Sequence, residues 1–98
     1  MVFRSTDRGR TWQALGEVAG NWPINAIAVM TTESGDSLPI IAAGEDLWVW
    51  QEASQQWQSA VKVKEPLCFA LLPTASGNEV AALVGTAQGT VERHRLQV

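Results

Sequence analysis

One stretch decides how this chain is expected to fold: Ser5-Thr6-Asp7-Arg8-Gly9-Arg10-Thr11-Trp12. An aspartate side chain accepts hydrogen bonds from backbone N–H groups two or more residues further on, and glycine tolerates the positive φ of a tight turn. A tryptophan can then pack its large apolar face beside the turn while its indole N–H finds an acceptor. The stretch therefore predicts a hairpin turn between two short strands.

Outward from this turn, the sequence repeats weakly with a period of 41 to 45 residues. Three runs at residues 24–30, 40–44 and 47–50 return in the same order at 67–72, 81–85 and 90–93. A fourth run at 56–61 matches residues 10–15, which places Trp57 45 positions after Trp12. Self-similarity at this period is typical of propellers and solenoids.

The runs themselves indicate strands. Each is short, apolar or alternating, and bounded by Gly, Ser or Asn, whereas none is long enough to predict a helix. We therefore expect an all-β chain of nine strands forming a single segment, residues 1–98. Residues 2–16 would supply the two outer strands of one repeat, 24–61 a full repeat of four strands, and 67–97 the first three strands of another.

The turn sequence resembles the Asp box, Ser-x-Asp-x-Gly-x-Thr-Trp, also called the bacterial neuraminidase repeat, at each defining position. The second copy is degenerate, with Glu52 in place of Asp7, Ser54 in place of Gly9 and Gln56 in place of Thr11, and it keeps Trp57. The chain thus resembles about two blades of an Asp-box β-propeller. Proteins that share this motif include sialidases, other glycoside hydrolases, sorting-receptor ectodomains and photosystem assembly factors.

The resemblance implies blades of four antiparallel strands that form an incomplete ring within one chain. It also implies a structural role at the periphery of the propeller for the residues of the box, namely Ser5, Asp7, Gly9, Thr11 and Trp12. Because a propeller closes with about 4–8 blades, two blades need partners. We expect those partners to be further copies of the chain or the remaining blades of a longer chain.

Composition excludes several classes of function. Seven Lys and Arg against ten Asp and Glu give a net charge of −3, which argues against binding to nucleic acid. No apolar run approaches the ~20 residues that span a bilayer, so we expect no membrane insertion. The N-terminus lacks a signal-peptide pattern, which predicts a cytoplasmic location if the chain is complete. Cys68 is the only cysteine and has no internal disulfide partner, so we expect it to be a small buried apolar residue.

Catalysis is not expected, and neither is a metal or a cofactor. Sialidases similar to this family use a tyrosine nucleophile, and the chain contains no tyrosine. Other glycosidases need two carboxylates about 5–9.5 Å apart, but the acidic candidates lie in turns or hairpins that are ordinarily solvated. His94 stands between two arginines with no second ligand at a telling spacing. The acidic candidates are Asp36, Glu45, Asp46 and Glu52.

The five tryptophans divide into two groups. Trp12, Trp48 and Trp57 occupy repeat-matched positions, which predicts packing between blades. Trp22, in a loop, and Trp50, on a strand, are the candidates for an exposed aromatic contact.

The leading hypothesis is therefore a non-enzymatic propeller scaffold or protein-interaction module. The alternative is part of a glycan-processing or glycan-binding sialidase-like propeller. A third reading is a small β-sandwich in a compact monomer.

Overall fold

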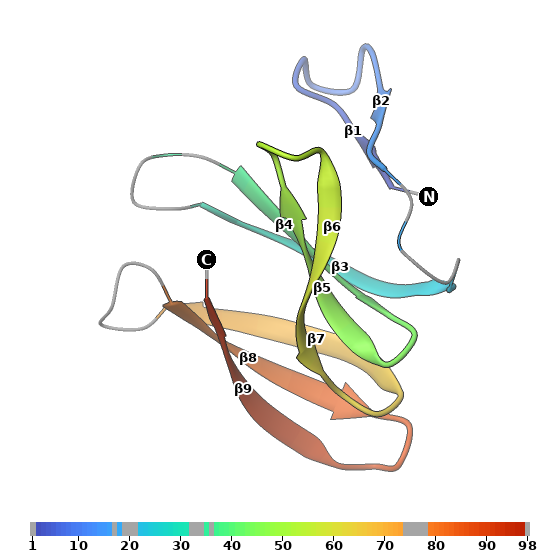
Figure 1. Ribbon diagram of the computed structural model, residues 1–98, viewed down its shortest axis with the longest axis vertical. Helices are drawn as coiled ribbons and strands as arrows, with labels where there is room; N and C mark the ends of the chain where they lie inside the picture. Colours follow the sequence, from blue (N-terminus) through green and yellow to red (C-terminus); the bar gives the residue numbers. More distant parts are fainter. Residues whose placement is uncertain are drawn as a thin grey trace.

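The computed structural model describes residues 2–16, 18, 22–31, 35, 37–73 and 79–97. Within those residues the chain forms nine β-strands and no helix (Figure 1), which confirms the expectation of an all-β protein with nine strands. No segment of the described chain is a helix long and apolar enough to cross a membrane.

The strands form three separate antiparallel sheets, each following chain order. The N-terminal hairpin consists of β1 (Phe3–Arg4) and β2 (Gln13–Ala14). The central sheet consists of β3 (Ile24–Thr31), β4 (Ser37–Ala43), β5 (Asp46–Gln51) and β6 (Gln56–Lys62). The C-terminal sheet consists of β7 (Pro66–Pro73), β8 (Glu79–Thr86) and β9 (Val91–Gln97).

The two larger sheets repeat each other in detail. In each, the first strand carries a β-bulge near its start, between Ile24 and Ala26 in β3 and between Pro66 and Cys68 in β7.

Strand β4 begins three residues before the apolar run at residues 40–44, because Leu38 and Pro39 continue the ladder opposite Met30 and Val29. Gly44 lies outside the strand, in the following turn, with φ of 63°.

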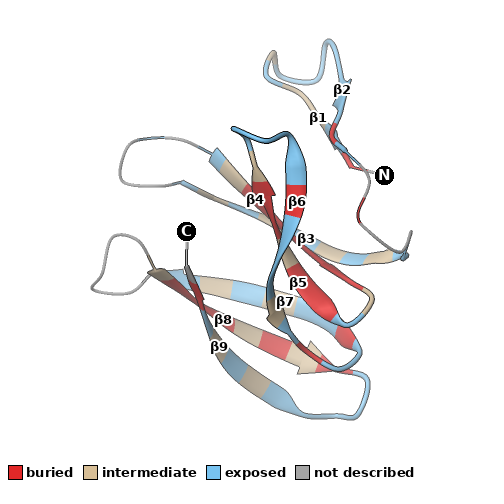
Figure 2. Ribbon diagram, viewed as in Figure 1, coloured by how far each residue is buried: buried red, intermediate tan, exposed pale blue. Residues whose placement is uncertain are grey.

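Both faces of the central sheet are buried. Successive side chains of a strand point to opposite faces, yet four consecutive residues of β4, Ile40 to Ala43, are fully buried. Figure 2 shows buried residues concentrated along β4, β5 and β8. The central sheet is therefore the middle layer of three.

One face of the central sheet packs against the C-terminal sheet. There Ile40, Ala42, Leu47 and Val49 share a core with Val63, Val80, Ala82, Val84 and Leu96. Strand β3 lies beside β7, and β6 lies beside β9. The other face packs against the N-terminal segment, where Val2, Leu15 and Val18 share a second core with Ile41, Ala43, Trp50 and Trp57. The backbone bond from Leu15 N–H to the Val2 carbonyl, 2.8 Å, closes the hairpin beside this core.

Candidate functional site

The turn between β1 and β2 is closed by its own side chains. The carboxylate of Asp7 accepts hydrogen bonds from the backbone N–H of Thr11 at 2.9 Å and from its hydroxyl at 2.5 Å. The hydroxyl of Ser5 donates to Asp7 at 2.8 Å and accepts from the N–H of Gly9 at 2.7 Å. Arg8 and Gly9 both adopt positive φ, 62° and 87°. The hydrogen bond that Asp7 was expected to accept from a backbone N–H is therefore present.

These bonds favour the ionised form of Asp7. Donation by the hydroxyl of Thr11, then by its backbone N–H, and then by the hydroxyl of Ser5 lowers the pKa of Asp7 from 3.8 to about 2. An acid with such a low pKa is a poor proton donor near neutral pH.

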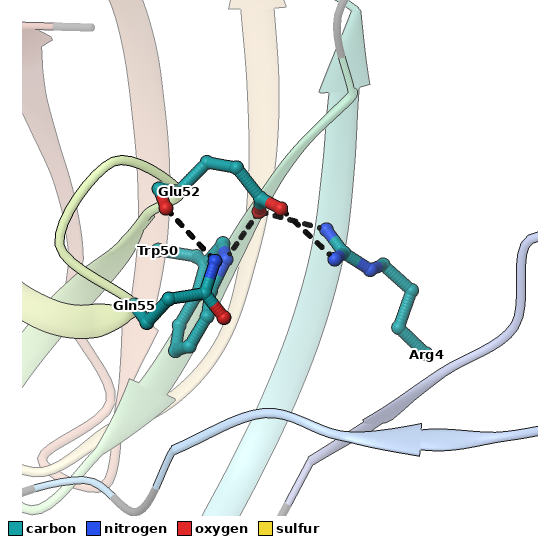
Figure 3. Close-up of polar contacts among 4 residues, drawn as sticks. All are labelled: Arg4, Trp50, Glu52 and Gln55. Carbon is teal, nitrogen blue, oxygen red and sulfur yellow. Dashed lines mark hydrogen bonds and ion pairs between the residues drawn. The ribbon is translucent and has the colours of Figure 1, made fainter.

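The equivalent acid in the second hairpin, Glu52, bonds outside its own turn (Figure 3). Its two carboxylate oxygens accept from the two terminal nitrogens of Arg4 at 3.0 and 3.1 Å, and one of them also accepts from the indole N–H of Trp50 at 2.6 Å. The side chain of Gln55 donates to the backbone carbonyl of Glu52 at 2.8 Å. This cluster ties the N-terminal hairpin to the turn between β5 and β6.

The same contacts set the charge states in the cluster. Hydrogen bonding to Arg4, followed by that to Trp50, lowers the pKa of Glu52 from 4.5 to about 2, and the pKa of Arg4 is raised chiefly by its bond to Glu52. The sequence marked Glu52 only as a replacement for aspartate. Its partner Arg4 lies 48 positions away, so only the packing of the hairpin on the central sheet could reveal the pair.

Two of the tryptophan predictions are wrong. Trp50, a candidate for an exposed aromatic contact, is only 2% exposed, because it lies on the face of the central sheet that the N-terminal segment covers. Its ring meets that of Trp57 edge to face, with centroids 5.2 Å apart. Trp12, expected to pack between sheets, is 64% exposed. The hairpin that bears it has only two short strands and offers little surface to cover the ring.

The other three tryptophans differ in how far they are buried. Trp57 is buried and donates its indole N–H to the Gly16 carbonyl at 2.6 Å, and half-buried Trp48 donates to the Ala43 carbonyl at 3.0 Å. Trp22 is 53% exposed. Its ring lies against the backbone of Gly44, where an added Cβ would come within 2.7 Å of it. Trp22 thus rests one part of its ring on the Gly44 backbone and keeps another part open to solvent.

The remaining polar candidates make ordinary pair contacts. Asp46, which is buried, accepts from the hydroxyl of Ser59 and lies 3.8 Å from the ammonium of Lys62. His94 lies 3.0 Å from Glu92. Asp36 lies outside the described residues. Asp46 and Glu52 stand at opposite ends of β5, about 20 Å apart at the rise of a strand, too far for a glycosidase pair.

No cluster of three potential metal ligands occurs within the described ranges. Cys68 forms no disulfide and is exposed, so the expectation that it is buried is wrong: its side chain lies on the open face of β7. The side chains that the structure brings together are therefore the turn of Ser5, Asp7, Gly9 and Thr11, and the cluster of Arg4, Trp50, Glu52 and Gln55. Both are positioned by hairpin turns at the ends of strands.

The chain matches no protein-family model, no curated protein and no solved structure.

Proposed function

We propose that this chain is a segment of an Asp-box β-propeller and acts as a non-enzymatic scaffold or protein-interaction module. Further blades, from other copies or from a longer chain, would complete the ring. The observation that carries the proposal is the burial of both faces of the central sheet between two neighbouring sheets, each made of strands in chain order. Blades of a propeller pack face to face in this way.

The burial pattern argues against a two-layer sandwich. In a sandwich each strand alternates between residues that face the core and polar residues that face water. In β4, Ile40 and Ala42 belong to one core and Ile41 and Ala43 to the other. A third layer is needed to account for this strand.

The hydrogen-bonded turn at Asp7 supports the Asp-box assignment. Its Ser, Asp, Gly and Thr all make or permit the bonds that close a hairpin, which explains why a turn would use those residue types at that spacing. The turn lies at the outer end of the hairpin (Figure 1), away from both cores. A position of that kind favours a structural role or a contact with another protein.

Three acids of the described chain support a non-enzymatic role. Asp7 holds a turn, Asp46 bonds to Ser59, and Glu52 binds Arg4 and Trp50. We infer that these carboxylates hold the fold together. A screen of fluorogenic glycosides should then show no turnover, and turnover that Glu52→Gln or Asp46→Asn abolishes without unfolding the protein would contradict the proposal.

A glycan-binding role is the second candidate, and the exposed rings of Trp12 and Trp22 favour it, because the flat apolar face of an indole can stack on a sugar. Titration of tryptophan fluorescence with neutral and sialylated oligosaccharides tests this role. Quenching that Trp22→Ala removes would support it, and an unchanged spectrum would favour the scaffold.

A crystal structure tests the propeller itself. We expect successive sheets to be related by rotation about a common axis, with β3 and β7 nearest to that axis and β6 farthest from it. Sheets stacked without such an axis would contradict the proposal.

A further inference from the structure

Strand β3 presents an apolar surface that the rest of the chain does not cover. Ile27 and Val29 are 56% and 60% exposed. Ile27 stands opposite Ile41 in the ladder, so both side chains lie on the face of the central sheet that the N-terminal segment covers over β4 to β6. We call Ile27 and Val29 the β3 surface. It is the open half of a face whose other half is already an interface.

Strand β7 presents a second apolar surface, at the opposite end of the stack. Ala82 and Val84 point into the core between sheets, so the residues that alternate with them in the ladder point outward. On β7 these outward residues are Cys68, Ala70 and Leu72, all exposed, with Leu72 at 43%. We call these three residues the β7 surface. Apolar side chains that are exposed side by side on a sheet face favour contact with a partner.

The β3 surface and the β7 surface are equivalent to the two surfaces that pack on each other at the junction between the central and C-terminal sheets. Ile27 pairs with Ile41, which lies three residues before Gly44. Leu71 pairs with Ala82, which lies three residues before Gly85. Ile27 and Leu71 therefore occupy equivalent positions in the two sheets. Ala26 pairs with Ala42, and Ala70 pairs with Leu83. Each partner lies two residues before its glycine, so Ala26 and Ala70 are also equivalent.

Ala26 of β3 and Leu71 of β7 both pack against the core between the two sheets. Their open equivalents are Ala70 on the β7 surface and Ile27 on the β3 surface. The junction between the central and C-terminal sheets therefore shows how the β7 surface of one molecule fits the β3 surface of another.

We propose that a second copy of this chain docks head to tail, with the β7 surface of one copy on the β3 surface of the next. The inference rests on the stacked sheets of the proposed function and names the partner. In this arrangement β7 of the docked copy packs on β3, beside the part of the central sheet that the N-terminal segment already covers. The contact joins two different surfaces, so it can propagate and close a ring.

A mixing experiment tests the docking. One double variant, Ile27→Arg with Val29→Arg, blocks the β3 surface, and another, Ala70→Arg with Leu72→Arg, blocks the β7 surface. These side chains are exposed or lie outside both cores, so each variant should keep the near-ultraviolet circular dichroism of the wild type. Masses are measured by sedimentation equilibrium at about 100 μM, against 10.6 kDa for one chain.

The wild type should associate, and each variant alone should be a monomer. An equimolar mixture should form a dimer and stop there, because only one β3 surface and one β7 surface remain intact. A monomeric wild type, a variant that still associates alone, or a mixture that stays monomeric would each overturn the proposal. None of these outcomes bears on whether the sheets are related by rotation about a common axis. A crystal structure of the chain tests that part of the proposed function separately.

Disulfide trapping gives a second readout that needs no charged substitution. In a Cys68→Ser background, Ile27→Cys with Ala70→Cys should form intermolecular bonds on oxidation and give a ladder of linked chains. The matched control replaces Ala70→Cys with Gln58→Cys, an exposed residue on β6, and should give no ladder. Equal cross-linking in both pairs, or none in the first, would overturn the docking.

Discussion

The two hairpin turns that end in Trp12 and Trp57 occupy equivalent places in the repeat but are held in different ways. In the first, Asp7 closes its own turn through Thr11 and Ser5. In the second, Glu52 reaches out to Trp50 and to Arg4 of the neighbouring hairpin. Local chemistry is sufficient for the first turn, whereas the second depends on how two sheets pack.

The tryptophans that follow the two turns also differ, in how far they are buried. Trp57 is 8% exposed and hydrogen-bonded to Gly16, whereas Trp12 is 64% exposed. A turn that is locally complete thus ends in an exposed ring, and a turn that depends on packing ends in a buried one. The contrast teaches that a matched position in a repeat does not guarantee a matched environment when the neighbouring sheet differs.

The largest expected effect comes from truncating the buried tryptophan. Trp57→Ala should lower the free energy of unfolding by about 3–5 kcal/mol, because it leaves a cavity in the core beneath the hairpin and an unpaired carbonyl at Gly16. Trp12→Ala, the matched control, should change it by less than about 0.5 kcal/mol. Urea denaturation followed by circular dichroism measures both. Equal losses at the two positions would erase the contrast between the turns.

The glycine of the first turn should matter more than its counterpart. Gly9 has φ of 87°, so Gly9→Ala should destabilise the protein by about 1–2 kcal/mol through backbone strain alone, since the added Cβ would lie at an ordinary 3.7 Å from Trp12. Ser54→Gly in the second turn should relieve no such strain. The melting temperatures of the two variants, each compared with that of the wild type, measure the two effects. A neutral Gly9→Ala would show that the first turn is not held in this conformation.

Acid should weaken both turns over the same range of pH. The folded-state pKa values of Asp7 and Glu52 are lowered to about 2 from 3.8 and 4.5. A carboxylate with a depressed pKa stabilises the fold above its unfolded pKa and loses that contribution as pH falls through the folded value. The melting temperature should therefore hold above about pH 5 and fall toward pH 2. Asp7→Asn should make this decline shallower, and an unchanged decline in both Asp7→Asn and Glu52→Gln would place the acid-sensitive groups elsewhere.

The smallest expected effect is the coupling between Arg4 and Glu52. A double-mutant cycle of Arg4→Gln and Glu52→Gln should show that the two losses are not additive, and added salt should reduce the coupling because Glu52 is exposed. A cycle of Arg4→Gln with Asp7→Asn should show additive losses, because among the described residues the side chain of Asp7 bonds within its own turn. Coupling of equal size in the two cycles would contradict the assignment of Glu52 as the link between hairpins.

The sequence predicted the strands and the first turn because both depend on local patterns. Short apolar runs between turn residues indicate strands, and the bonds of Asp7 join residues no more than four positions apart. Trp50 was misjudged because alternation along β5 tells which residues share a face but not whether that face is covered. The ion pair of Arg4 and Glu52 joins residues 48 positions apart, so no local sequence pattern predicts it.

The most direct test of the stacked sheets is thiol labelling on the two faces of β4. In a Cys68→Ser background, Ala42→Cys probes the face toward the C-terminal sheet, and Ala43→Cys probes the face toward the N-terminal hairpin. Both alanines are fully buried, so both thiols should react only as fast as the protein unfolds. Rapid labelling of Ala43→Cys in the folded protein, with Ala42→Cys protected, would reduce the structure to two layers and contradict the account.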